Sequence, residues 1–135
     1  MKVIIAPSKT MKYQKSNFEC TPLLHPNETN YLHSILMNYN DEKLCELMKI
    51  SYKQALKVYD YFHQEYPIHP ALSLYQCTVF KQLHLEMYEE HSHYLNQHFN
   101  ILSASYGILK YNTGITPYRL DMTMKPDHIN LYEYW

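Results

Sequence analysis

The stretch Lys2-Val3-Ile4-Ile5-Ala6-Pro7-Ser8-Lys9-Thr10-Met11 decides the architecture of this chain of 135 residues. Its β-branched, apolar start predicts a central strand over Val3–Ala6 that ends at Pro7. Because ligands commonly bind at strand ends in α/β sheets, the polar residues that follow are candidates for a site. Their ammonium and hydroxyl groups suit a phosphate or a carboxylate. A turn with a helix cap explains Ser8 and Thr10 equally well, and the glycines of a Walker loop are absent.

A second group of candidate site residues lies near the C-terminus, and it includes residue types that are rare in this chain. The segment Ser105–Lys110 is followed by Thr116–Met122, and the second of these contains Arg119, the only arginine in the sequence. Tyr118 with Arg119 places a guanidinium beside an aromatic ring, which suits phosphate recognition. A salt bridge between Arg119 and Asp121 explains the same residues as well. The first segment loosely resembles a helix-hairpin-helix, in which backbone amides grip a DNA phosphate.

Helical patterns dominate the first half of the chain. Apolar spacing predicts a helix that is capped by Thr29 or Asn30 and runs through Tyr39, and a second helix from Asp41 onward. Ser51 with Gln54 predicts a third helix that begins with a capping box. The remaining expectations are a His-rich helix over 86–96, a strand over 99–103, a helical turn over 105–109 and a strand over 118–122, with 71–83 open between helix and strand. The fold class is therefore α+β, a small mixed sheet with clustered helices in one domain over residues 1–135.

Composition narrows the possible functions. The formal net charge of −1 favours neither nucleic acid nor acidic partners for the chain as a whole, although four lysines precede the first acid, Glu19. Three cysteines without short spacing predict reduced thiols in a cytoplasmic protein rather than a disulfide framework. The nine histidines include no pair at helical metal-ligand spacing, so no metal or cofactor is expected. No apolar run is long enough for a membrane span.

Taken together, these motifs resemble the YaaA family of peroxide-stress proteins. The family's Ser-Pro-(Ala/Ser)-Lys-Thr-(Leu/Met) motif after its first strand is matched by Ala6–Met11, and its Leu-Met-(Arg/Lys)-Ile-Ser segment is matched by Leu47–Ser51. Its Leu-Ser-(Gly/Ala)-x-Tyr-Gly-(Val/Ile)-Leu-(Arg/Lys) run is matched by Leu102–Lys110. Pro-Tyr-Arg-Leu-(Glu/Asp)-Met is matched by Pro117–Met122, and Leu-Tyr-x-(Phe/Tyr)-Trp by Leu131–Trp135. The motifs keep the family's order and span the whole chain.

The resemblance implies a bacterial, cytoplasmic protein that limits oxidative damage under hydrogen peroxide and lowers free intracellular iron. It also implies weak, sequence-independent binding of duplex DNA through a positively charged cleft with a helix-hairpin-helix-like element. It identifies no catalytic residue and no cofactor. The residues carried over to the cleft by their match to the family motifs are Ser8, Lys9, Thr10, Tyr106, Gly107, Lys110, Tyr118 and Arg119.

The chain departs from the family in length and in two motifs. Family members are much longer, so the chain resembles their N-terminal half, in truncated form. Tyr75–Leu83 lacks the lysine, the acid and both glycines of the family's Phe-Lys-Gly-Asp-Val-Tyr-x-Gly-Leu motif, and an Arg-Pro pair has become Lys110-Tyr111. A half-domain should expose a sheet edge and an apolar face. We therefore expect self-association, a second chain that supplies the missing half, or marginal stability.

Two other functions stay open. An enzyme or binding protein for a small phosphorylated or nucleotide-like ligand would hold the anion with Ser8-Lys9-Thr10 and Arg119. A non-functional remnant would keep only the exposed half-core as a binding surface, and would self-associate without responding to any ligand.

Overall fold

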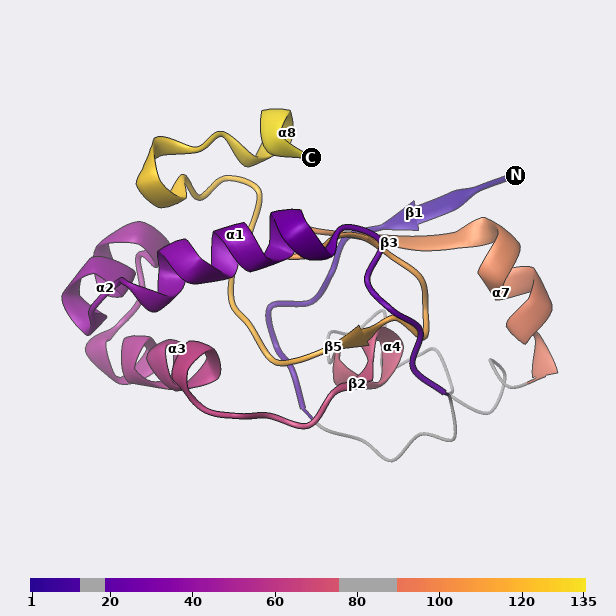
Figure 1. Ribbon diagram of the computed structural model, residues 1–135, viewed down its shortest axis with the longest axis horizontal. Coiled ribbons are helices and arrows are strands. Elements are labelled where there is room, and N and C mark those ends of the chain that lie inside the picture. The colour runs from indigo at the N-terminus through magenta and orange to yellow at the C-terminus, as the bar shows by residue number, and fades with distance from the viewer. Residues whose placement is uncertain (13–18, 76–89) are drawn as a thin grey trace.

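The computed structural model describes residues 1–12, 19–75 and 90–135, and it has the α+β architecture that the sequence predicts. Helices cluster at one end of a small mixed sheet, and a further helix lies at the opposite end (Figure 1). The clustered helices are α1 (Pro26–Met37), α2 (Asp41–Met48) and α3 (Tyr52–His63), and the helix at the far end is α7 (Ser92–His98).

Within the described part of the chain, the main sheet has three strands in the order β1-β3-β4. The edge strand β1 (Val3–Ile5) pairs in parallel with β3 (Phe99–Ser103), which pairs antiparallel with β4 (Gly107–Leu109). A second sheet joins β2 (His69–Pro70) to β5 (Gly114–Ile115). The sequence predicts strands over Val3–Ala6 and over 99–103, and β1 and β3 confirm both predictions.

The helices form where local signals begin them and apolar spacing gives them a buried face. α1 has Pro26 in its first turn, where a missing N–H costs no hydrogen bond. It therefore begins before the predicted cap at Thr29 or Asn30, and its Leu32 and Leu36 are wholly buried. The predicted capping box of α3 is confirmed: the Gln54 N–H donates to Ser51 Oγ (3.2 Å), and the Ser51 N–H donates to Gln54 Oε1 (3.3 Å).

The two faces of the main sheet differ in burial, because successive side chains of a strand point to opposite sides. On one face Ile101 and Leu109 are wholly buried in the core that the helices complete. On the other face Ile4, Leu102 and Ile108 are exposed. The sheet therefore separates a packed core from an outward face that the described residues leave uncovered.

The helical turn expected over 105–109 is wrong, because this segment forms a β-hairpin. After β3 the chain reverses through Ala104–Tyr106 and returns as β4. Gly107 has φ +72°, a left-handed conformation that side chains other than glycine rarely adopt. Ser103 Oγ accepts hydrogen bonds from the backbone N–H groups of Ser105 and Tyr106, both at 3.2 Å. The expected helix-hairpin-helix-like element is thus a hairpin of two strands.

The strand expected over 118–122 is also wrong. Pro117 has no N–H to donate, and the N–H of Tyr118 points to the sulfur of Met11 at 3.5 Å rather than to a neighbouring strand. Tyr118 and Leu120 are buried while Arg119 is partly exposed, so the segment alternates in burial like a strand without pairing as one.

The other expectations are met in part. In the open region 71–83, Ala71–Leu74 forms the single helical turn α4, and residues beyond Tyr75 lie outside the described part of the chain. The helix predicted over 86–96 corresponds to α7, which is shifted towards the C-terminus, and residues 86–89 are not described. The chain then ends with η1 (Pro126–His128) and α8 (Leu131–Tyr134).

Candidate functional site

The turn after β1 presents polar side chains in the way that the sequence predicts. Ser8 is buried, and its Oγ donates to the carbonyl of Thr10 (2.9 Å) and accepts from the N–H of Thr10 (3.1 Å). The hydroxyl of Ser8 therefore holds the turn. The sequence context allowed this role beside that of binding a phosphate or a carboxylate. The side chains of Lys9 and Thr10, which follow Ser8, are exposed.

A small cavity of about 180 Å³ lies between this turn and α3. Among the described residues, three basic side chains line it: Lys9 from the turn, Lys57 from α3 and Arg119 from the segment after β5. We call this cavity the basic pocket, and its remaining lining residues are Thr10, Met11, Gln54, Val58 and Tyr61. The sequence motifs at the two ends of the chain thus meet at one place.

Arg119 has an unusual environment in the basic pocket. Its Nε is buried and has no hydrogen-bond partner among the described residues. Leaving a buried donor unpaired costs roughly 1–3 kcal/mol, and more when the group is charged. The planar guanidinium suits carboxylate and phosphate oxygens. An orphaned guanidinium nitrogen beside two lysines therefore points to an anion as the natural occupant of the pocket.

Asp121 pairs with Lys9 and not with Arg119. Lys9 Nζ lies 2.9 Å from Asp121 Oδ2, with the lysine 60% exposed and the carboxylate 24% exposed. Burial raises the pKa of Asp121, but hydrogen bonds from Thr123 and Lys9 outweigh that effect and leave the pKa below its ordinary value. Asp121 is therefore ionised at neutral pH and neutralises one of the three cations of the pocket.

The tyrosines that the family motifs place in a cleft lie instead inside the core. The Tyr118 hydroxyl lies 2.8 Å from the Tyr75 hydroxyl and 2.7 Å from Ser103 Oγ. The Tyr106 hydroxyl accepts from the N–H of Thr116 at 3.2 Å, and its ring packs edge-on against Tyr118. Burial raises the pKa of both Tyr106 and Tyr118. These rings hold the hairpin and the segment after β5 together, and they offer no face to a ligand.

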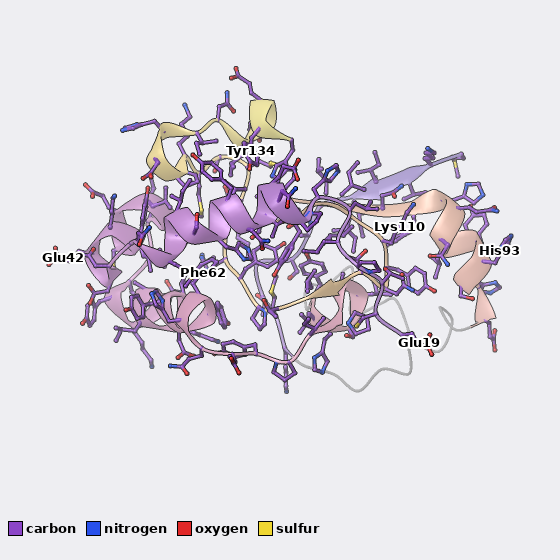
Figure 2. The ribbon with its side chains drawn as sticks, in the orientation of Figure 1. Glu19, Glu42, Phe62, His93, Lys110 and Tyr134 are labelled. Atoms are coloured by element: carbon purple, nitrogen blue, oxygen red, sulfur yellow. The ribbon has the colours of Figure 1, made fainter. Side chains whose placement is uncertain are left out.

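Gly107 and Lys110 lie away from the basic pocket. Gly107 is buried under Trp135, whose indole N–H donates to the carbonyl of Ala104 at 2.8 Å. Because β4 runs antiparallel to β3, Lys110 returns to the start of β3, where its Nζ donates to Asn100 Oδ1 at 2.9 Å. Figure 2 shows Lys110 on the side of the molecule that carries α7. The structure therefore gathers Lys9, Thr10 and Arg119 at the basic pocket, and separates them from Lys110.

Sequence reasoning missed the contribution of α3 to the pocket. Gln54, Lys57, Val58 and Tyr61 recur at the spacing i, i+3, i+4, i+7, which places them on one face of a helix. Lys57 Nζ lies 5.9 Å from the centre of the Tyr61 ring, a favourable contact between a cation and an aromatic ring. This stripe was visible in the sequence, but nothing there indicated that it faces the turn after β1.

Within residues 1–12, 19–75 and 90–135, no group of three or more His, Cys, Asp and Glu side chains is arranged to hold a metal ion. Among the helices of these same ranges, none is both long and apolar enough to cross a membrane.

Comparison with known proteins identifies relatives across the whole chain. The family model described as peroxide stress protein YaaA matches residues 1–135. Curated relatives, each named a UPF0246 protein, include one from Rickettsia felis, 38% identical over 142 residues, and one from Fusobacterium nucleatum, 32% identical over 144 residues. Another, from Finegoldia magna, is 34% identical over 139 residues.

These relatives are considerably longer than the match. Each alignment covers 100% of this chain, but only 56% of the Rickettsia felis and Finegoldia magna proteins and 57% of the Fusobacterium nucleatum protein. The chain thus spans little more than half the length of these relatives. With its motifs in the family's order and the family model matched from end to end, this chain belongs to the YaaA family of peroxide stress proteins.

Proposed function

We propose that this chain binds duplex DNA without sequence preference, with a backbone phosphate seated in the basic pocket. The observation that carries the proposal is the buried, unpartnered Nε of Arg119, a residue that lines the same pocket as Lys9 and Lys57. Contacts to phosphate fix a protein on DNA without reading its sequence, and lysine and arginine supply most of them. The hydroxyl of Thr10 and the amide of Gln54 provide further hydrogen-bonding groups at the rim.

The size of the pocket favours a phosphate of a polymer over a small-molecule ligand. Sites for drug-sized ligands commonly enclose roughly 300–1,000 Å³, whereas this cavity holds about 180 Å³. It has room for one phosphate group but not for a whole nucleotide. Because a single phosphate contact gives little affinity by itself, other parts of the protein surface must also contact the duplex.

The position of Lys110 sets the geometry of such a complex. Lys110 lies beside Asn100 at the start of β3, whereas Lys9 follows the end of β1, which runs parallel to β3. The two lysines therefore flank opposite ends of the sheet and would meet different phosphates of a duplex. The deeply buried Tyr106, Gly107 and Tyr118 act in this proposal by shaping the protein, without touching DNA.

The binding experiment is a titration of a labelled mixed-sequence duplex, followed by fluorescence anisotropy at several salt concentrations. Removing one phosphate contact should weaken binding to all sequences and reduce the salt slope by about 1. We expect this for Lys57→Gln, which changes an exposed side chain, and for Arg119→Gln. Lys2→Gln is the matched control, because Lys2 is an exposed lysine outside the pocket.

Two results would overturn this function. One is an unchanged salt slope in both Lys57→Gln and Arg119→Gln, with circular dichroism showing that the variants are folded. The other is a chain that fails to bind duplex at low salt but whose melting temperature rises with a mononucleotide or inorganic pyrophosphate. That second result would favour the small phosphorylated ligand that the sequence left open.

The family's description supports a place for this binding in the response to peroxide. We expect the chain, expressed in a bacterium that lacks its own family member, to raise survival under hydrogen peroxide. Lys57→Gln should lose part of that protection, because it weakens the proposed contact without disturbing the core. Equal survival with and without the wild-type chain would contradict a protective role.

A further inference from the structure

The outward face of the main sheet carries apolar side chains that no described residue covers. Ile4 is 68% exposed, Ile108 is 43% exposed and Leu102 is 38% exposed. Leu102 and Ile108 are direct cross-strand partners, and Ile4 lies on the adjacent strand β1. Single exposed apolar residues are ordinary on a protein surface, but three on one sheet face form a contiguous patch.

A groove extends this patch along the sheet. Its volume is about 510 Å³, and the residues that line it are predominantly apolar. Ile4 and Leu102 of the sheet form part of its lining, and Leu120, Met122 and Tyr132 of the C-terminal segment form another part. α8, which contains Tyr132, lies at the upper edge of the molecule in Figure 1, on the same side as β1. The groove is thus built from both ends of the chain.

The edge strand next to the groove is also open. Among the described residues β1 pairs with β3 alone, so its other edge presents unpaired N–H and C=O groups. Proteins usually cover or disrupt such an edge, since it can recruit another strand. An apolar groove beside an open strand edge is the arrangement used when an extended segment adds to a sheet and buries alternate side chains.

We propose that this face binds polypeptide equivalent to the part of the longer relatives that the present chain does not match, whether that polypeptide is joined to the chain or separate from it. The argument for this occupant is length: the alignments cover 100% of this chain but only 56% of the Rickettsia felis relative. The bound polypeptide places apolar side chains in the groove over Leu102 and a strand along β1.

This docking surface is distinct from the phosphate contact, although the two adjoin. Lys9 lines both the basic pocket and the groove, with Asp121 paired to it at 2.9 Å. A polypeptide seated in the groove therefore lies next to the basic pocket. The inference does not depend on DNA binding, because it rests on the apolar face, the strand edge and the length of the relatives.

The test is co-expression of this chain with the unmatched part of the Rickettsia felis relative, followed by light scattering of the purified material. We expect a complex of one copy of each. Leu102→Glu should weaken it at least tenfold, because it places a charge in the centre of the apolar face. The matched control is Leu56→Glu: Leu56 is 46% exposed on α3 and lines neither the groove nor the basic pocket.

A fusion of the two polypeptides keeps the proposal testable if one of them does not fold alone. Leu102→Glu should lower the melting temperature of the fusion by more than it lowers that of the isolated chain. Leu56→Glu should lower the melting temperatures of the fusion and of the isolated chain by the same amount. Equal shifts for Leu102→Glu would overturn the proposal. So would a monomeric chain that forms no complex, or a chain whose Leu102→Glu variant only dissociates a homodimer, which would make a second copy the occupant.

Discussion

His33 of α1 lies beneath the β3–β4 hairpin, among groups that leave its charged form poorly solvated. Its Nε2 is 2.6 Å from Ser105 Oγ, and the rings of Phe62 and Tyr106 pack edge-on against it at 5.4 and 5.2 Å between centres. Burial lowers the pKa of His33 from 6.5 to about 4. Tyr106, the titratable neighbour, is neutral throughout the acid range because burial raises its pKa. The imidazole is therefore neutral in the folded protein at pH 7.

This lowered pKa makes the stability of the fold depend on pH. Unfolding returns the ring to water, where its pKa is 6.5. Between pH 6.5 and about pH 4 the unfolded chain binds more protons than the folded chain, so the free energy of unfolding falls as the pH falls. The full difference between the two pKa values corresponds to roughly 3 kcal/mol. Against a total of about 5–15 kcal/mol for a typical protein, one side chain thus controls a substantial fraction of the stability.

The measurement is urea unfolding followed by circular dichroism at several values between about pH 7.5 and about pH 4. His33→Gln keeps a hydrogen-bonding amide near Ser105 and does not titrate. We expect the wild-type chain to lose roughly 3 kcal/mol more than His33→Gln over this range. His93→Gln is the matched control, because His93 is exposed on α7 and its variant should follow the wild-type profile.

If the wild-type chain and His33→Gln lose stability in parallel, burial of the His33 ring does not make stability depend on pH. That result would mean that the His33 ring is solvated when it is protonated, and that the hairpin does not bury it.

Three further substitutions test other parts of the fold. Gly107→Ala should destabilise the chain by roughly 2–4 kcal/mol, because φ is +72° there and the new Cβ would lie 2.7 Å from the Trp135 ring. An unchanged melting temperature would contradict the hairpin geometry. Ser51→Ala should cost about 1 kcal/mol in urea unfolding through loss of the α3 capping box, and an unchanged midpoint would show that the cap contributes nothing. Tyr118→Phe should cost roughly 1–3 kcal/mol, because Ser103 Oγ and the Tyr75 hydroxyl lose a buried partner; stability equal to that of the wild type in the same assay would argue against the buried cluster.

Local signals predicted the first half of the fold well because they act within a few residues. The capping box at Ser51 and the apolar face around Leu32 depend only on helical spacing, and both are confirmed. The errors came where distant contacts decide the structure. The segment 105–109 has too few residues to show a period, and its path depends on Ser103 and on Trp135 covering Gly107. The segment 118–122 has the alternation of a strand, but no strand among the described residues pairs with it.

The same distinction applies to the candidate site. The sequence singled out Ser8-Lys9-Thr10 and Arg119, and the structure brings Lys9, Thr10 and Arg119 together at the basic pocket, while Ser8 holds the turn beside it. It could not show that α3 adds Lys57, because that contact depends on how the helix packs against the turn. It also could not show that the hairpin carries Lys110 to the other end of the sheet. Residue types were therefore predictable, and their assembly across the fold was not.

In the ion pair between Lys9 and Asp121, a side chain of the protein neutralises one of the cations that line the basic pocket. Under the proposed phosphate contact, an incoming phosphate reaches the charge of Lys9 only by displacing the Asp121 carboxylate. The displaced carboxylate stays beside the contact and offsets the ammonium charge, so Lys9 neutralises less phosphate charge and adds less salt dependence than an unpaired lysine would. Because the pKa of Asp121 lies below its ordinary value, the carboxylate competes throughout the neutral range. Asp121→Asn would convert Lys9 into an ordinary phosphate contact and make binding both tighter and more sensitive to salt.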